Sequence, residues 1–311
     1  MSRVDRREFM AGLAALPVVA AGAGALLASP AFAQAAGAYN TRPLKPVGEV
    51  PVVGMGSAQV FSNPTTEEQL APLRATLARF AELGGKVIDT APSYGRAEEV
   101  IGTLVAQLGM RDKLYFATKV GANNLDEGKA QIERSFANLK TDKIELMAVH
   151  NLRDVDNHLP YLRELQAAGR IGAVGVTTSS DQQYEAFAAL MERTPLDCIQ
   201  VDYALDNRNA AQRILPLAQE KGIPVMVNLP FGRNRLFQAT AGKPLPHWAA
   251  EIGATSWAQV FLKYITSHPS RPIPIPGTDQ VRYAEDNLGA ARGRLPDAAL
   301  RTRMEQFIDG L

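Results

Sequence analysis

From residue 52 onward the chain alternates between two patterns of apolar residues. Short runs of β-branched or apolar residues, typical of buried strands, are separated by stretches in which apolar residues recur three or four positions apart, as on one face of a helix. The clearest helical stripe is Trp257, Val260, Phe261, Tyr264 and Ile265. The eight predicted strands cover residues 52–55, 86–89, 114–119, 145–150, 173–177, 197–201, 224–228 and 272–276.

This alternation of strands and helices predicts a parallel sheet. Eight strand-helix units with no internal linker predict a single (β/α)8 TIM barrel within residues 34–311. The alternative is an open doubly wound sheet, which usually has a glycine-rich turn after its first strand. The segment at 54–58, Gly-Met-Gly-Ser-Ala, lacks the third glycine of that turn.

Two stretches do not fit the repeat. Residues 34–47 have no core-forming pattern and are expected to lie over the barrel or to remain mobile. Residues 229–254 are rich in Pro, Gly, Asn and Arg, so we expect an extended loop over the end of the seventh strand that helps to form a site.

Residues 1–33 have the composition of a cleavable export signal. Arg6 and Arg7 precede an uncharged segment rich in Ala, Leu, Val and Gly, which ends in the small-x-small sequence at 31–33. The segment resembles a twin-arginine export signal, which implies a periplasmic location and only transient contact with the membrane. The alternative is a membrane anchor, which Pro17, Pro30 and several glycines disfavour.

Charge and cysteine content limit the possible partners. With Lys+Arg 33 against Asp+Glu 32 the formal charge is +1, and no basic run suggests nucleic acid as a partner. The single cysteine, Cys198, excludes an internal disulfide, and its apolar neighbours favour a place in the core.

Four ionisable residues stand at the ends of neighbouring strands, where a barrel places its chemistry. Asp89 ends the second strand and Tyr94 follows it, Lys119 ends the third strand and His150 ends the fourth. Each could have a purely structural role, but together they predict one site. No metal is implied, because His150 has no second histidine or carboxylate at ligand spacing.

Several segments around these residues resemble the aldo-keto reductase family. The segment at 87–95 resembles the family's Asp-Thr-Ala-x-x-Tyr-Gly motif, and the segments at 116–120 and 146–151 resemble its lysine and histidine strands. The resemblance extends through 174–177, 199–203 and 275–289. It implies reduction of a small aldehyde or ketone, or the reverse oxidation of an alcohol, with NADPH or NADH.

In this resemblance Tyr94 is the proton donor and Lys119 is the cation that lowers the pKa of its phenol. Asp89 holds the ammonium, and His150 orients the carbonyl oxygen.

The resemblance also implies residues that bind the cofactor. The resemblance implies that Thr177, Thr178 and Gln200 bind the nicotinamide carboxamide. Asn228 stands where many relatives have an aromatic residue that stacks on the nicotinamide. NADP is favoured, but the preference stays open because Tyr283 stands where many relatives place an arginine, with Arg282 one residue earlier. The full predicted set is Gly56, Ser57, Thr177, Thr178, Gln200, Asn228, Gly277, Thr278, Arg282, Asp286 and Asn287.

Two other functions remain open at this point. One is an exported barrel that binds or senses a cofactor with little or no turnover, since free NADPH is not expected outside the cytoplasm. The other is a phosphate-binding lyase or isomerase, although no glycine-rich phosphate loop follows the seventh strand. The sequence does not identify the substrate, the physiological direction or the oligomeric state, and a monomer is compatible with it.

Overall fold

The structure is a computed structural model that describes residues 37–311. The predicted export signal at residues 1–33 lies outside these residues.

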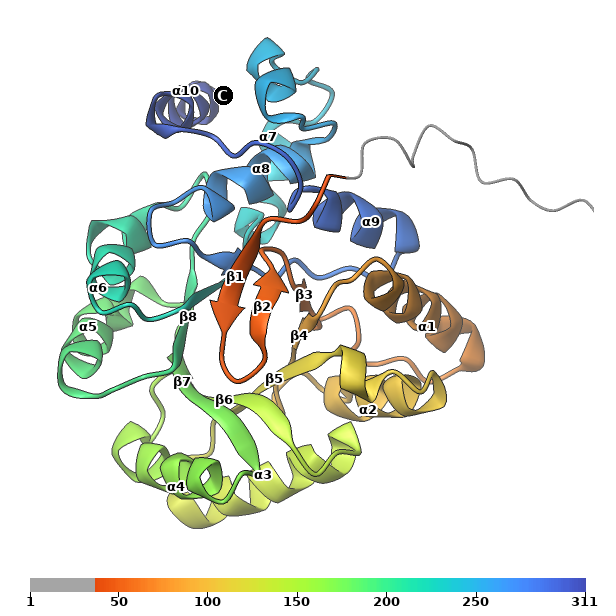
Figure 1. Cartoon of the computed structure of the whole chain (residues 1–311), viewed down its shortest axis with the longest axis vertical. Helices are drawn as coiled ribbons and strands as arrows, with labels where there is room; N and C mark the ends of the chain where they lie inside the picture. The colour runs from red at the N-terminus through yellow and green to blue at the C-terminus, as the bar shows by residue number, and fades with distance from the viewer. Residues whose placement is uncertain (1–36) are drawn as a thin grey trace, which may run out of the picture. The chain divides into compact units, whose positions relative to one another are not determined.

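Eight parallel strands form one sheet whose order follows the chain from β3 to β10. Figure 1 shows the labelled strands β3 to β8 following one another around the barrel. The two end strands meet where Gly56 pairs with Gly277, and the Gly54 amide donates to the Pro274 carbonyl at 3.0 Å, which nearly closes the barrel. A Cβ on Gly56 would lie 2.6 Å from the Ile275 carbonyl oxygen, so the close approach of the strands requires glycine. The prediction of a single (β/α)8 barrel is confirmed. The strands are β3 Met55–Gly56, β4 Val87–Asp89, β5 Tyr115–Val120, β6 Ile144–His150, β7 Ile171–Thr177, β8 Cys198–Asp202, β9 Val225–Asn228 and β10 Ile273–Pro274.

Helices cover the outside of the barrel between successive strands (Figure 1). Their apolar stripes bury as the sequence predicts: Val260, Phe261, Tyr264 and Ile265 of α8 are all fully buried. Polar residues fix where helices begin, as in α1, where Thr66 and Gln69 form a capping box. The helices are α1 Glu67–Glu82, α2 Ala97–Gln107, α3 Leu125–Leu139, α4 Val155–Ala167, α5 Tyr184–Arg193, α6 Ile214–Glu220, α7 Arg235–Ala239, α8 Trp257–Thr266, α9 Val281–Gly289 and α10 Ala298–Asp309. None of the helices within residues 37–311 combines the length and apolar character needed to span a membrane.

A hairpin of β1 (Thr41–Leu44) and β2 (Gly48–Pro51) precedes the barrel. Leu44 and Val50 are 1% and 0% exposed and join the apolar residues that point into the barrel, so the hairpin contributes to the core. The expectation that residues 34–47 lack a core-forming pattern was therefore wrong for its second half. The segment pairs its short strand with the next one and buries one apolar side chain from each.

Residues 229–254 also contain more structure than predicted. They include α7 and two short 3-10 turns, Gly232–Asn234 and His247–Ile252. The ring centroid of Phe237 lies 5.6 Å from that of Phe261 in α8, and Trp248 lies 6.1 Å from Phe307 in α10. Aromatic contacts with α8 and α10 thus replace the expected extended loop.

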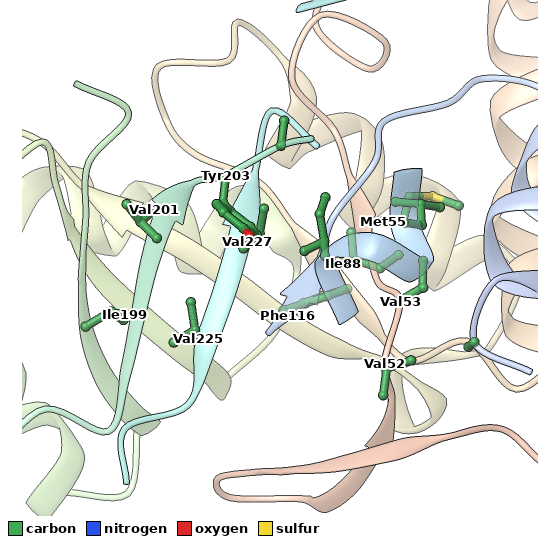
Figure 2. Close-up of a cluster of buried hydrophobic side chains, with 14 of the residues drawn as sticks. Val52, Val53, Met55, Ile88, Phe116, Ile199, Val201, Tyr203, Val225 and Val227 are labelled. Carbon is green, nitrogen blue, oxygen red and sulfur yellow. The ribbon is translucent and has the colours of Figure 1, made fainter. Parts of the chain in front are cut away.

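Alternating residues along each strand separate an outer and an inner set of core side chains. The outer set, part of which is drawn in Figure 2, packs beneath the helices and includes Phe116, Ile199 and Val227. The inner set fills the barrel and includes Tyr115, Cys198 and Met226. Cys198 is 1% exposed, and burial raises the pKa of its thiol to about 12, as befits a core residue.

Candidate active site

The inner positions turn from apolar to polar at the carboxyl end of the barrel. In β5 the inward residues are Tyr115, Ala117 and then Lys119, and β6 and β8 repeat the change at His150 and Gln200. The alternation of strand side chains therefore brings polar groups from neighbouring strands to one end. The inward residues at this end are Asp89, Lys119, His150, Thr177, Gln200 and Asn228.

The centre of this end is an ion pair. The Lys119 Nζ lies 2.9 Å from each carboxylate oxygen of Asp89 and 2.7 Å from the Thr90 carbonyl oxygen. Gln200 Nε2 donates to Asp89 Oδ1 at 3.0 Å. Burial is the largest single effect and lowers the pKa of Lys119, but the Asp89 carboxylate and Tyr94 together outweigh it and raise that pKa, so the ammonium stays charged.

Tyr94 lies in the loop between β4 and α2, above this ion pair. The Lys119 ammonium is 5.1 Å from the centroid of the tyrosine ring. The next residue, Gly95, has φ +59°, and a Cβ there would meet the Ser62 carbonyl oxygen at 2.7 Å. Glycine at this position thus lets the loop turn and holds Tyr94 near the barrel end.

The pKa of Tyr94 differs from the sequence-based expectation. Lys119 has the largest single effect and lowers this pKa, but burial and the Asp89 carboxylate together outweigh it. The pKa of the phenol is therefore raised above its ordinary value rather than lowered. At neutral pH the hydroxyl carries its proton.

His150 completes the group. Its ring centroid lies 6.1 Å from that of Tyr94, with the two planes at 86°. Burial, the Lys119 cation and Arg153 lower the pKa of His150 to about 4, so the imidazole is neutral at pH 7. The structure thus brings Asp89, Tyr94, Lys119 and His150 together at the barrel end where the sequence places them.

Buried polar atoms around this group fit a bound polar ligand. Within residues 37–311, Ser57 Oγ and Asn228 Oδ1 are buried and have no hydrogen-bond partner. Because buried polar atoms are usually satisfied, such atoms mark places where a ligand can supply the partner. Ser57 follows Gly56 at the end of β3, with its backbone amide donating to the Asp89 carbonyl at 3.0 Å, and Asn228 ends β9, so both lie at the end of the barrel that holds this group.

Two other predicted cofactor residues already have partners. The side-chain amide of Gln200 donates to the Asp89 carboxylate, and the Thr178 hydroxyl donates to Gln183 Oε1. The Thr178 amide donates to the Gln200 carbonyl at 3.0 Å, and Thr177 is buried beside it. These contacts fix the ends of β7 and β8 before any ligand binds.

The last predicted cofactor segment surrounds the start of α9. The Thr278 hydroxyl accepts from the Gln280 amide at 3.1 Å, just after Gly277 closes the barrel, and Asn287 is buried in α9. The Asp286 carboxylate accepts from Ser256 Oγ at 2.6 Å and from Gln259 Nε2 at 2.8 Å, which ties α9 to the first turn of α8.

Arg282 is exposed near the beginning of the same helix. Its guanidinium donates to Gln280 Oε1 and to the Tyr283 hydroxyl, both at 3.0 Å, and lies 4.5 Å from the centroid of the Tyr283 ring. A helix N-terminus with an adjacent guanidinium is suited to an anionic group such as a phosphate.

Comparison with known proteins agrees with this arrangement. A family model described as "Aldo/keto reductase family" matches residues 52–305, which include the whole barrel. The chain belongs to the aldo/keto reductase family.

Curated relatives in this family share about a quarter of their residues with this chain. Aldo-keto reductase YhdN of Bacillus subtilis is 29% identical over 194 residues, which cover 56% of each protein. Methylglyoxal reductase YeaE of Escherichia coli is 28% identical over 263 residues, covering 81% of this chain and 89% of that protein.

Solved structures share the fold. A Klebsiella pneumoniae aldo/keto reductase described in complex with NADP and acetate superposes with a TM-score of 0.73 at 22% identity, covering 87% of this chain and 95% of that one.

Two side chains beside the site of this aldo/keto reductase were not identified from the sequence. Gln183 accepts from Thr178 and donates through Nε2 to the Asn151 carbonyl at 3.0 Å, which links the ends of β7 and β6. Arg153 lies in the loop after β6 and donates to the Gly121 carbonyl at 3.2 Å. Only the position of Arg153, three residues after His150, could have drawn attention to it.

Proposed function

We propose that this aldo/keto reductase reduces a small aldehyde or ketone, with NADPH or NADH as hydride donor and Tyr94 as proton donor. The observation that carries the proposal is the convergence of Asp89, Lys119, Tyr94 and His150 at the carboxyl end of the barrel. The nicotinamide cofactor, when bound, supplies a hydride to the carbonyl carbon.

The side chains of this chain supply the rest of the chemistry. As the carbonyl oxygen gains negative charge, the protonated Tyr94 hydroxyl donates its proton to that oxygen. The Lys119 ammonium, held by Asp89, stabilises the phenolate that remains. Neutral His150 has one N–H to donate, and it orients the carbonyl oxygen toward Tyr94.

The cofactor is assigned to the polar residues around Asp89, Tyr94, Lys119 and His150 at the carboxyl end of the barrel. Ser57 and Asn228, whose buried oxygens lack partners, and the ends of β7 and β8 would hold the nicotinamide end. The segment from Gly277 to Asn287, with the exposed Arg282, would hold the phosphates of the adenosine end.

Names of similar proteins support both parts of the proposal. One relative is named a methylglyoxal reductase, and one from Schizosaccharomyces pombe is named aldo-keto reductase yakc [NADP(+)], with 24% identity over 310 residues. Similar solved structures are described as complexes with NADP or NADPH. These names do not favour the alternative of a binding or sensing barrel without turnover.

The proposal is tested by following cofactor oxidation with a panel of small aldehydes, NADPH and NADH being assayed separately. Oxidation that depends on both aldehyde and Tyr94 supports the reductase. Saturable cofactor binding without aldehyde-dependent oxidation would contradict it and would restore the binding or sensing interpretation.

We also propose that residues 1–33 are a twin-arginine export signal and that residues 34–311 act in the periplasm. The support is the sequence itself: Arg6 and Arg7 before an uncharged Ala- and Gly-rich segment that ends in small residues. Fractionation of a bacterium expressing the chain should find a periplasmic product that begins at Gln34. Replacing Arg6 and Arg7 with lysine should retain the precursor in the cytoplasm. A product that stays in the cytoplasm with the natural arginines would contradict export.

A further inference from the structure

The loop between β6 and α4 is held in an uncommon backbone conformation beside the active site. Asn151, Leu152 and Asp154 have φ values of +54°, +56° and +45°. Such values are uncommon for non-glycine residues, and among these three they are least usual for Leu152, because Asn and Asp tolerate this region more readily.

Three hydrogen bonds fix the loop, one from Gln183 in another segment and two within the loop and its flanking residues. Gln183 donates to the Asn151 carbonyl at 3.0 Å, the Arg153 amide donates to the His150 carbonyl at 3.2 Å, and Asn157 donates to Asp154 Oδ1 at 2.7 Å. The backbone of Arg153 therefore has a defined place, three residues after His150 of the proposed catalytic group.

The Arg153 side chain turns back across the end of β5. Its Nη1 lies 3.2 Å from the Gly121 carbonyl oxygen, two residues beyond Lys119. Gly121 itself adjoins the histidine, since a Cβ at Gly121 would lie 3.2 Å from His150 Cβ and 3.7 Å from His150 Nδ1. The guanidinium is also close enough to His150 to contribute to the lowering of its pKa.

This guanidinium has no acidic partner in the part of the chain that the structure describes. Six other exposed arginines do have one; Arg96, for example, pairs with Glu99 at 2.7 Å. No ion pair within residues 37–311 involves Arg153, which is exposed. The neighbouring Asp154 does not supply one, because one of its oxygens accepts from Asn157 and the other is buried.

We propose that Arg153 is a substrate-selecting residue that binds a carboxylate on the carbonyl substrate, so that the enzyme prefers aldehydes or ketones bearing a carboxylate. The inference rests on the proposed function, because it places the reacting carbonyl at Tyr94 and His150. A guanidinium is the side chain best suited to a carboxylate, since it can donate two parallel hydrogen bonds. The Arg153 guanidinium has no ion-pair partner in the described chain and is held beside His150, so it would bind the substrate carboxylate close to the reacting carbonyl oxygen.

The test compares two aldehydes: 4-carboxybenzaldehyde, which carries a carboxylate, and its methyl ester, which is neutral and larger by one methyl group. For each protein the ratio of kcat/KM for the acid to kcat/KM for the ester is measured with the same cofactor. We expect the unmodified enzyme to favour the acid. Arg153→Gln should lower the ratio about tenfold or more, chiefly through KM of the acid, as expected when a charge-assisted hydrogen bond is lost.

Two further variants separate charge recognition from damage to the loop. Arg153→Lys keeps the charge and should recover part of the ratio, whereas a purely structural role of the arginine would leave both variants alike. Arg134→Gln in α3 removes an exposed arginine that also lacks an ion pair among the described residues, and it should leave the ratio unchanged.

The possible failures are distinct. If both aldehydes are reduced but Arg153→Gln leaves the ratio unchanged, the carboxylate preference is overturned while the reductase stands. If neither aldehyde nor any member of the aldehyde panel is reduced with NADPH or NADH, the proposed function fails, and the inference fails with it.

Discussion

The Lys119 ammonium lies 2.9 Å from both carboxylate oxygens of Asp89, and the two side chains are only 2% and 6% exposed. The pair comes from the adjacent strands β5 and β4. Along each strand the inward-facing residues are apolar until the carboxyl end, where the charged residue stands. Because water is largely excluded from this position, each charge is stabilised mainly by its partner. The pair is therefore a structural element of the barrel as well as the electrostatic centre of the active site.

Replacing Lys119 with methionine should destabilise the protein by about 3–5 kcal/mol, because it leaves the Asp89 carboxylate buried without its counter-ion. The double variant Asp89→Asn, Lys119→Met should be less destabilised than this single variant, since no buried charge remains. Urea unfolding of the three proteins gives these values. A matched control is Glu133→Gln at the surface pair with Arg170, which should cost no more than about 1 kcal/mol. A loss as small as that control for Lys119→Met would contradict the role of the buried pair.

His150 should make the stability depend on pH in a defined window. Its pKa is about 4 in the folded protein and near 6.5 ordinarily, so between these values the unfolded chain binds the proton and the folded chain does not. The stabilisation is present above pH 6.5 and is lost as the pH falls toward 4. Urea unfolding at pH 7 and about pH 5 should show a smaller difference for His150→Asn than for the unmodified protein. Equal differences would contradict the lowered pKa.

The hairpin that closes the amino end of the barrel should matter for stability but not for chemistry. Leu44→Ala removes a side chain that is 1% exposed and should cost about 2–5 kcal/mol in the free energy of unfolding. The matched control Val47→Ala, in the exposed turn of the same hairpin, should change it by less than about 0.5 kcal/mol. A similar effect of both variants would mean that the hairpin does not belong to the core.

Arg282 should determine how much more tightly the protein binds NADPH than NADH. If its exposed guanidinium binds the 2′-phosphate, Arg282→Ala should weaken NADPH binding about tenfold or more and leave NADH binding almost unchanged. Fluorescence titration of each cofactor measures both constants. Equal weakening of the two would instead show that Arg282 acts on a group they share, and no change would remove it from the site.

The sequence predicted the barrel well because its strands are short apolar runs whose alternation determines both faces. It placed Asp89, Lys119 and His150 at one end for the same reason, as each simply continues the inward row of its strand. The first hairpin was missed because its strands have four residues each and contain prolines, so they show no clear period.

Other features depend on distances between segments that are far apart in the sequence, and no pattern along the chain contains these distances. The pKa of Tyr94 is raised because burial and Asp89 together exceed the effect of Lys119, a balance set by distances between three segments. Likewise, Asp286 matches a family position in sequence, but only the structure shows its carboxylate bound to Ser256 and Gln259. The loop that places Arg153 near His150 contains three residues with positive φ, and none of them is a glycine, so the sequence does not indicate this conformation.

Tyr94 is the residue on which the proposed reaction depends most, and a phenylalanine there removes only the hydroxyl. The most direct test compares the rate of NADPH or NADH oxidation by a small aldehyde between the unmodified protein and Tyr94→Phe, with the cofactor dissociation constant measured for both. We predict a fall in kcat of about a hundredfold or more, the contribution of a positioned proton donor, with the dissociation constant nearly unchanged. Turnover that survives the substitution, or an equal loss of turnover and cofactor binding, would contradict the assignment of Tyr94 as the proton donor.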